Sequence, residues 1–261
     1  MITVNGINIQ YIEKGTGYPL ILIHGLSDSS LLWTPLLQEF SHQYKTIAID
    51  VRGHGYSSKP DAPYTVTQFS HDFQAFCNAL SIQDCHLAGH SMGAAIAQQF
   101  ASDCRERVRS LVLLSPISSR DHTFAANLTK LQESITTGGT SAFFDEAIKL
   151  VVTPDFALAN SEALSDAKKI CMKTNSPTAI FNAIDACLKF DASNVNTKIS
   201  QPTLIISGKL DVFTPVQVAE KTQQEIENSE LKVVEGVGHN LFIPEKIAEL
   251  SEIILDFLRR H

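Results

Sequence analysis

Long apolar runs are missing from this sequence: no stretch approaches the 18 consecutive apolar residues that a membrane-spanning helix requires. The first fifteen residues also lack the basic start and the apolar core of a secretory signal. Basic residues are few, with 21 lysines and arginines against 28 acidic residues and a formal net charge of -7, and they form no cluster that would attract nucleic acid. We therefore expect a soluble, cytoplasmic protein that binds neither membranes nor nucleic acid.

Cysteine is scarce and follows no pattern. The five cysteines are odd in number, widely spaced and without a C-x-x-C pair, which argues against a disulfide framework and against a structural zinc site. We expect each of them to be an ordinary thiol in a reducing compartment, and we expect no metal site.

Short apolar runs and amphipathic stretches alternate along most of the 261 residues. The dipeptide Asn5-Gly6 separates two strand-like stretches and predicts an antiparallel hairpin. The later apolar runs are nearly continuous, as in strands that helices cover on both faces. These runs are residues 20–23, 46–49, 85–88, 108–114, 203–206 and 231–234. The pattern predicts an α/β fold with a mostly parallel, doubly wound sheet of about eight strands, which binds ligands at the carboxyl ends of its strands.

The alternation stops between Pro116 and about Asn196, where only helical patterns occur. Apolar residues recur there with helical spacing, and breaks are expected at Gly138-Gly139 and Thr153-Pro154. A segment of this length without a strand predicts a helical cap over the functional edge of the sheet. We therefore divide the chain into a core of residues 1–116 and 197–261 and a helical cap of residues 117–196.

The sharpest local signal is GHSMG, residues 89–93, which lies between the strand-like CHLA and the helical run AAIAQQFA. In a G-x-S-x-G turn the serine, here Ser91, occupies a strained position between strand and helix that presents its hydroxyl at the edge of the sheet. That hydroxyl needs a base, and His239 is predicted to be this base because it follows the last predicted strand. We expect His90 to be a packing residue and His24 to brace its own loop.

The histidine in turn needs a carboxylate that fixes its tautomer and stabilises the imidazolium. Asp211 directly follows the strand-like TLIIS and is the predicted acid, whereas the competitors Asp185 and Asp191 fall in the predicted cap. Charge that develops on a carbonyl oxygen needs fixed donors. The backbone amides of Leu26 and Met92 are predicted to form this oxyanion hole.

Five motifs, in this order, resemble those of the α/β-hydrolase superfamily. HGLSDSSLLW is similar to its oxyanion loop, DVRGHGYS to its D-x-R-G-x-G-x-S turn, GHSMG to its nucleophile elbow, and GKLDVFTP and GVGHN to its acid and base loops. The resemblance covers nearly the whole chain. It is closest to the compact capped branch that includes carboxylesterases, 3-oxoadipate enol-lactonases, the pimeloyl-ester hydrolase of biotin synthesis and carbon-carbon bond hydrolases.

The resemblance implies a catalytic triad in the chain order Ser91, Asp211, His239 and a structural role for residues 50–57. Ser91 stands where haloalkane dehalogenases and most epoxide hydrolases of this superfamily carry aspartate, which argues against those reactions. Cofactor-free haloperoxidase-like relatives do carry serine, and their perhydrolysis uses the same esterase machinery. We therefore expect a carboxylesterase-like serine hydrolase that cleaves a small ester or lactone through an acyl-enzyme, without a cofactor, as a monomer or homodimer.

Aromatic residues in the cap and near the oxyanion loop are candidates for an apolar substrate pocket. We expect two or three of them to line it and the others to pack the cap on the core; they are Trp33, Phe124, Phe143, Phe144, Phe156 and Phe181. The cap contains a single arginine, Arg120, so no arginine cluster marks a dicarboxylate site. A small, uncharged acyl ester is favoured.

Three other functions remain open on this scaffold. A carbon-carbon bond hydrolase would use the same triad with a positive carboxylate anchor in the cap. An acyltransferase would need an alcohol or thiol acceptor that outcompetes water. A ligand sensor would keep the triad but turn its ligand over slowly, since a fold alone does not fix a function.

Overall fold

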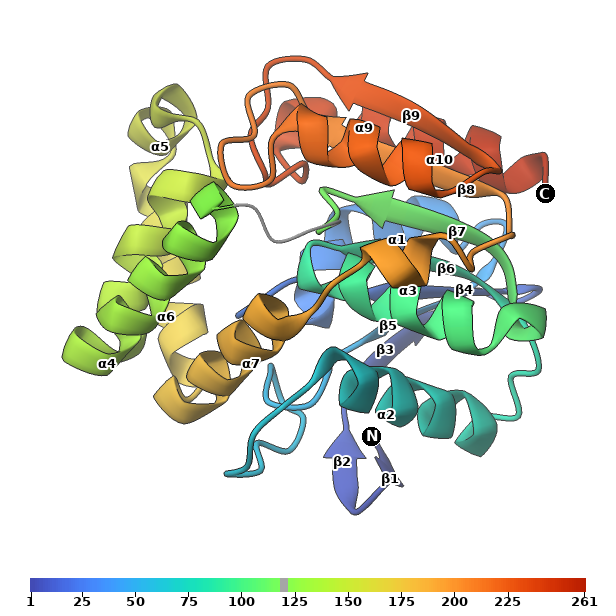
Figure 1. The fold of residues 1–261 in the computed structure, drawn as a ribbon, viewed down its shortest axis with the longest axis horizontal. Helices are drawn as coiled ribbons and strands as arrows, with labels where there is room; N and C mark the ends of the chain where they lie inside the picture. The colour runs from blue at the N-terminus through green and yellow to red at the C-terminus, as the bar shows by residue number, and fades with distance from the viewer. Residues whose placement is uncertain (118–121) are drawn as a thin grey trace.

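The computed structural model describes residues 1–117 and 122–261, and within them a seven-stranded sheet forms the centre of the protein (Figure 1). The strand order is β3-β5-β4-β6-β7-β8-β9, and every neighbouring pair is parallel except β3 with β5. The strands are β3 (Tyr11–Lys14), β4 (Pro19–Ile23), β5 (Lys45–Ile49), β6 (Cys85–His90), β7 (Val108–Leu114), β8 (Thr203–Gly208) and β9 (Ser229–Val234). The predicted α/β class with a mostly parallel sheet is therefore confirmed.

The first two strands form a separate hairpin. β1 (Ile2–Val4) pairs antiparallel with β2 (Ile7–Ile9), and Asn5 and Gly6 between them have φ angles of 50° and 75°. Positive φ at both central residues is what a tight two-residue hairpin turn requires. The predicted hairpin is confirmed, and the main sheet of the described residues has seven strands where about eight were expected.

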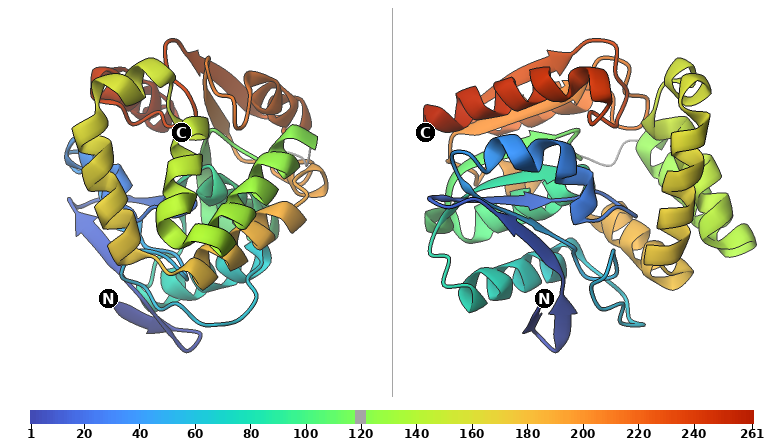
Figure 2. Two further views of the ribbon diagram at one scale, coloured as in Figure 1. Left: turned by 90° about the vertical axis from the view of Figure 1, so that its left-hand side faces the viewer. Right: turned by 180° about the vertical axis from the view of Figure 1, so that it is seen from behind.

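Helices cover both faces of the sheet, as Figure 2 shows from two further sides. α2 (Val66–Ala79), α3 (Met92–Asp103) and α9 (Val216–Glu225) pack on one face, and α1 (Thr34–Phe40) and α10 (Ile247–Arg259) on the other. Successive strand residues face opposite sides of a sheet. In β4, Leu20 and Leu22 accordingly enter one core cluster and Ile21 and Ile23 the other. This double coverage explains why the strands appear as continuous apolar runs in the sequence.

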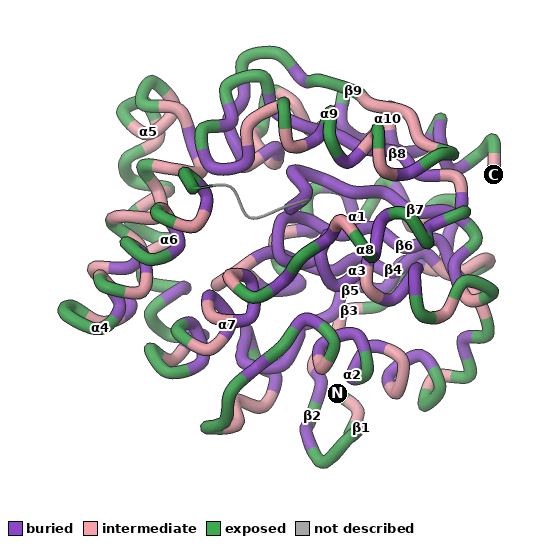
Figure 3. Tube along the Cα trace, in the orientation of Figure 1, coloured by how far each residue is buried: buried purple, intermediate pink, exposed green. Residues whose placement is uncertain are grey.

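Between β7 and β8 the described residues form helices only, and most of them stand at one end of the sheet (Figures 1 and 2). They are α4 (His122–Val151), α5 (Pro154–Ala159), α6 (Ser161–Thr174), α7 (Pro177–Lys189) and α8 (Ser193–Asn196). α4 is kinked at Gly139, where φ is 63°, and Thr153 caps the start of α5, so both expected breaks are present. Figure 3 shows that α4 to α7 keep exposed and half-buried residues, whereas the central strands are largely buried.

Candidate active site

Ser91 lies at the sharp turn where β6 ends and α3 begins. Its φ of 54° is unusual for a residue with a side chain, and such strained positions cluster at functional sites. The flanking glycines make the turn possible. A Cβ on Gly89 would lie 2.2 Å from the carbonyl oxygen of Gly93, and one on Gly93 would lie 2.3 Å from that of Ile23. Only residues without side chains fit, so the chain holds the serine at the carboxyl edge of the sheet.

The structure brings Ser91, His239 and Asp211 together from three loops that follow β6, β9 and β8. His239 Nε2 lies 2.9 Å from Ser91 Oγ, and His239 Nδ1 lies 2.8 Å from Asp211 Oδ2. Because an ionised carboxylate only accepts hydrogen bonds, Nδ1 carries the proton and Nε2 is free to accept from the serine hydroxyl. All three residues are buried, with exposed fractions of 5%, 2% and 5% respectively.

The surroundings of Asp211 favour its ionised form. Burial raises the pKa of this carboxyl group, but the nearby charge of His239 and its hydrogen bond, together with the amides of Thr214 and Phe213, outweigh burial and leave the pKa below its usual value. Those two amides donate to Oδ1 at 2.8 Å each, and the Thr214 hydroxyl donates to Oδ2 at 3.0 Å. Asp211 is therefore a fixed anion beside the imidazole.

The backbone of His239 is held from several sides. Its carbonyl oxygen accepts hydrogen bonds from Ser115 Oγ at 2.9 Å and from His90 Nε2 at 3.2 Å. The next residue, Asn240, donates its amide to the carbonyl of Val151 at the end of α4, at 2.7 Å. His90 is therefore more than packing: it positions the histidine loop, and its Nδ1 is buried without a partner among the described residues.

The predicted oxyanion donors flank the serine. Met92 is the first residue of α3, where amides have no partner within the helix, and Leu26 follows Gly25 in the loop after β4. No acceptor for either amide is present among the described residues. A Cβ on Gly25 would lie 3.4 Å from Ser91 Cβ, so this loop runs directly beside the serine. Both amides are available for a ligand oxygen.

His24 and Asp50 hold the neighbouring loops. His24 Nδ1 donates to the Gly25 carbonyl at 2.7 Å, and its Nε2 accepts from the Val51 amide at 3.0 Å. Asp50 accepts from the amides of Ser30 and Tyr56, each at 2.7 Å. His24 braces its loop as expected, and the Asp50 turn makes only structural contacts.

A cavity of about 170 Å³ opens over the serine and is called the serine cavity below. Its walls are mainly apolar and come from the oxyanion loop, the cap and the loops after β8 and β9; they include Leu26, Leu32, Leu131, Phe143, Phe144, Ala147, Ile148, Val151, Leu164, Ala167 and Phe213. Phe143 and Phe144, two of the predicted pocket residues, are among them.

The other predicted aromatic residues lie elsewhere. Trp33 is fully buried and packs edge-on against Phe242, with ring centroids 5.0 Å apart. Phe124 packs against Phe213, which itself separates it from the imidazole, and half-exposed Phe181 lines a different cavity between α4 and α7. Phe156, on α5, also does not line the serine cavity. Helical spacing alone does not show which face of a cap helix meets the cavity.

The remaining sequence predictions concern charged and thiol groups. Asp185 is paired with Lys189 at 2.6 Å on α7, away from His239. Arg120 lies outside the described residues.

All five cysteines are free, and burial raises the pKa of Cys77, Cys171 and Cys187 to about 12, which disfavours reactive thiolates. None of the described helices is both long enough and apolar enough to cross a membrane.

The sequence prediction did not name several residues of the serine cavity, and one of them, Asp28, is the only acidic side chain among the described residues that line it. It belongs to the same HGLSD loop as Leu26 and lines the cavity together with Ser91 and His239. Burial raises the pKa of its carboxyl group to about 7, and the nearby charge of His239 opposes this only in part. Its signal in the sequence was an acidic residue three positions after Gly25, in a loop already expected at the functional edge.

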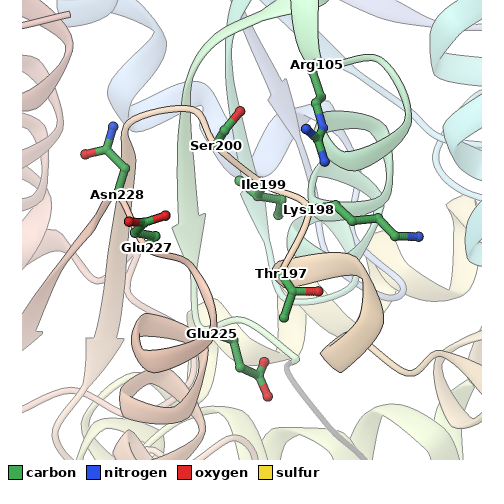
Figure 4. Close-up of a pocket in the computed structure, with 8 residues that line it drawn as sticks. All are labelled: Arg105, Thr197, Lys198, Ile199, Ser200, Glu225, Glu227 and Asn228. Atoms are coloured by element: carbon green, nitrogen blue, oxygen red, sulfur yellow. The ribbon is translucent and has the colours of Figure 1, made fainter.

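A second, larger cavity of about 590 Å³ lies at the opposite edge of the sheet, and Figure 4 shows its lining residues. They all precede strands: Arg105 comes before β7, residues 197–200 before β8, and Glu225, Glu227 and Asn228 before β9. We call it the amino-edge cavity. Its lining mixes Arg105 and Lys198 with Glu225 and Glu227. It contains no catalytic combination of side chains, and Glu225 already accepts from Asn196 at 2.7 Å.

Comparison with known proteins adds four similarities, one to a family model and three to individual proteins. Residues 18–246 match the family model described as alpha/beta hydrolase fold. The chain is 24% identical to RutD of Azorhizobium caulinodans, assigned as a carbamate hydrolase, over 89% of this chain and 88% of that protein. It is 28% identical to N-formylmaleamate deformylase of Pseudomonas putida, over 91% and 88%. The enol-lactonase of Burkholderia xenovorans LB400 superposes with a TM-score of 0.89 at 22% identity, over 98% of each chain.

Proposed function

Because the chain belongs to the alpha/beta hydrolase fold family, we propose that it is a serine hydrolase that cleaves a small carboxylic ester or lactone through an acyl-enzyme. The observation that carries this proposal is the unbroken hydrogen-bonded series from Ser91 Oγ through His239 to Asp211, at 2.9 and 2.8 Å. Nucleophile, base and orienting acid within hydrogen-bond reach of one another are the requirement for an activated serine.

In the proposed reaction, Ser91 Oγ attacks the substrate carbonyl carbon while His239 Nε2 takes the hydroxyl proton. The carbonyl oxygen becomes an oxyanion, and the amides of Leu26 and Met92 donate to it. Asp211 stabilises the imidazolium through Nδ1–H. His239 then gives the proton to the leaving alkoxide, and the carbon–oxygen bond breaks to leave an acyl-serine.

A water molecule completes the cycle. His239 Nε2 takes a proton from this water, whose oxygen attacks the acyl carbon, and the same proton returns to Ser91 as the ester bond breaks. The cavity volume of about 170 Å³ and its apolar walls favour a short acyl chain. The proposed substrate class is therefore a small ester or lactone rather than a long-chain lipid.

A second candidate is hydrolysis of a carbon–nitrogen bond in a carbamate or amide. It is favoured by the names of two similar proteins, a carbamate hydrolase and a deformylase. It is also favoured by Asp28, an acidic group in the serine cavity that could accept a hydrogen bond from a substrate N–H. The same residues would act, with His239 protonating a leaving nitrogen instead of an oxygen.

The proposal is tested by rapid mixing of the enzyme with p-nitrophenyl butyrate. An acyl-enzyme predicts a burst of one p-nitrophenol per active site, followed by slower steady turnover when deacylation limits the rate. A panel of esters and lactones of graded chain length, with carbamates and formamides beside them, identifies the substrate class. Turnover of the carbamates and formamides alone would favour the second candidate. If Ser91→Ala, still folded, kept near-native ester hydrolysis, the serine mechanism would be wrong.

A further inference from the structure

Asp28 occupies the wall between two cavities on the cap side of the oxyanion loop. It lines the serine cavity and also an adjoining cavity of about 210 Å³, and Leu32, Phe144 and Ala167 are likewise shared by both. The loop is fixed from the cap, because Asn175 Nδ2 donates to the carbonyl of Ser27 at 2.9 Å. The Asp28 side chain therefore has a defined place beside the space that the acyl group of a substrate would fill.

The carboxyl group of Asp28 has no hydrogen-bond donor among the described residues; its backbone amide alone is bonded, to the Gly25 carbonyl at 3.3 Å. Asp211, by contrast, accepts from the amides of Phe213 and Thr214 as well as from His239. Asp28 is only partly exposed, and burying a carboxylate without a partner is costly. A ligand that brings a donor would remove this cost.

The charges around Asp28 indicate what that ligand would carry. The titratable groups that face it are His239, from the loop after β9, and the Cys171 thiol, from α6. Among the described residues that line the serine cavity there is no lysine or arginine. A substrate carboxylate would therefore find no lysine or arginine to pair with and would lie near the carboxyl group of Asp28.

We propose that Asp28 is a specificity-determining residue that binds an N–H group, either an ammonium or an amide, on the acyl part of the substrate. This inference rests on the proposed serine hydrolase function and extends it. Asp28 selects a substrate by charge and hydrogen bonding, while Ser91 and His239 perform the chemistry. A charge-assisted hydrogen bond of this kind corresponds to a preference of about tenfold or more.

Two matched pairs of p-nitrophenyl esters test the proposal. The β-alanine ester carries an ammonium where the butyrate ester carries a methyl, and the succinamate ester carries an amide NH2 where the levulinate ester carries a methyl. For each pair, kcat/KM is measured for the wild type, Asp28→Asn, Asp28→Leu and the control Glu227→Gln, which removes one negative charge in the amino-edge cavity. The ratio within a pair cancels effects on the reaction itself.

We expect the wild type to prefer the N–H member of at least one pair, and this identifies the ammonium or the amide as the bound group. The ammonium-to-methyl ratio should fall about tenfold in both Asp28 variants and stay unchanged in Glu227→Gln. The amide-to-ketone ratio should fall more in Asp28→Leu than in Asp28→Asn, because asparagine keeps an accepting oxygen.

In the wild type the ammonium-to-methyl ratio should also rise between pH 6 and pH 8, about one pH unit either side of the pKa near 7, as Asp28 ionises. This pH dependence is measured on the wild-type protein alone.

Equal ratios in the wild type and the Asp28 variants, with no change in ratio with pH, would overturn the proposal. So would a loss of kcat on both members of each pair at unchanged KM, because Asp28 would then be assisting His239 rather than selecting the substrate. Failure of the Asp28 proposal can be distinguished from failure of the proposed serine hydrolase function. If the serine hydrolase function were wrong, Ser91→Ala would hydrolyse the butyrate ester as fast as the wild type, whatever the substrate ratios of the Asp28 variants.

Discussion

The two cavities at opposite edges of the sheet differ in volume and in the chemical character of the residues that line them. The amino-edge cavity is the larger, about 590 Å³ against about 170 Å³, and it is lined by charged and polar residues near solvent. The serine cavity is small and mostly apolar, and its few polar groups converge on one point. The larger volume of the amino-edge cavity therefore does not make it the better candidate; the serine cavity is the proposed active site because hydrogen-bonded polar groups converge within its apolar walls.

The parallel sheet explains the difference. In a parallel sheet all strands end at the same edge, so the loops after β4, β6, β8 and β9 meet there although they are far apart in the sequence. These loops supply Leu26, Ser91, Asp211 and His239. The cap covers this edge and narrows the space above it. The amino edge receives the chain before each strand.

The largest expected difference in activity is between two serine-to-alanine variants, one in each cavity. Ser91→Ala should lower ester hydrolysis by at least about five orders of magnitude, because no other hydroxyl of the described residues is hydrogen-bonded to His239 Nε2. Ser200→Ala, in the amino-edge cavity, should leave kcat/KM within about twofold. Both are measured with p-nitrophenyl butyrate after circular dichroism confirms folding. A large loss in Ser200→Ala alone would reverse the assignment of the two cavities.

The orienting acid gives the next largest effect. Asp211→Asn should lower kcat by about three to four orders of magnitude, because the amide no longer holds the imidazole in the required tautomer. The matched change Asp185→Asn removes a carboxylate from the cap, where it is paired with Lys189, and should change kcat by less than about twofold. Comparable losses in the two variants would mean that Asp211 is not the specific partner of His239.

The cavity walls predict a smaller, substrate-dependent effect. Phe144→Ala removes a ring from the serine cavity and should lower KM for an octanoate ester about tenfold relative to butyrate, since the space opened would bury about two of the additional methylenes at about 0.8 kcal/mol each. Phe181→Ala removes a half-exposed ring from a different cavity and should leave this chain-length preference unchanged. Equal shifts in both variants would place the acyl chain outside the serine cavity.

The smallest expected effect is on the free energy of unfolding, which the ionisation of Asp28 lowers. Its folded pKa of about 7 lies above an unfolded value of about 4, so the folded state holds its proton more tightly and wild-type stability declines as pH rises between these values. Asp28→Asn lacks this titration. Its free energy of unfolding should therefore gain about 1 kcal/mol on the wild type between pH 4 and pH 8, less than the full pKa shift implies because the side chain is partly exposed. A pH-independent difference in urea melts would contradict this.

The sequence was most informative where local constraints and function coincide. The elbow could be predicted because Gly89 and Gly93 leave no room for a Cβ, and Asn5-Gly6 because both residues need positive φ. The central strands could be predicted because both of their faces are buried, which produces continuous apolar runs. In these places a few neighbouring residues determine the structure.

The cap and the cavity could be predicted only in outline. Periodicity places Phe124 on an apolar stripe of α4, but only the folded structure shows that Phe124 packs on Phe213 while Phe143, beyond the kink at Gly139, lines the serine cavity. The importance of Asp28 was also hidden, because an acidic residue in a loop is usually solvated. Its environment depends on tertiary contacts that the sequence does not show, because Asn175 binds the carbonyl of Ser27 and Phe144 lines the same cavity as Asp28.

Covalent labelling is the sharpest test of the proposal that Ser91 is the activated nucleophile. The protein is treated with a fluorophosphonate, digested, and mapped by mass spectrometry. We expect a single adduct on the peptide that contains Ser91, formed much more slowly in Asp211→Asn and absent in Ser91→Ala. Stoichiometric labelling of another residue, or no labelling of folded wild-type protein, would contradict it.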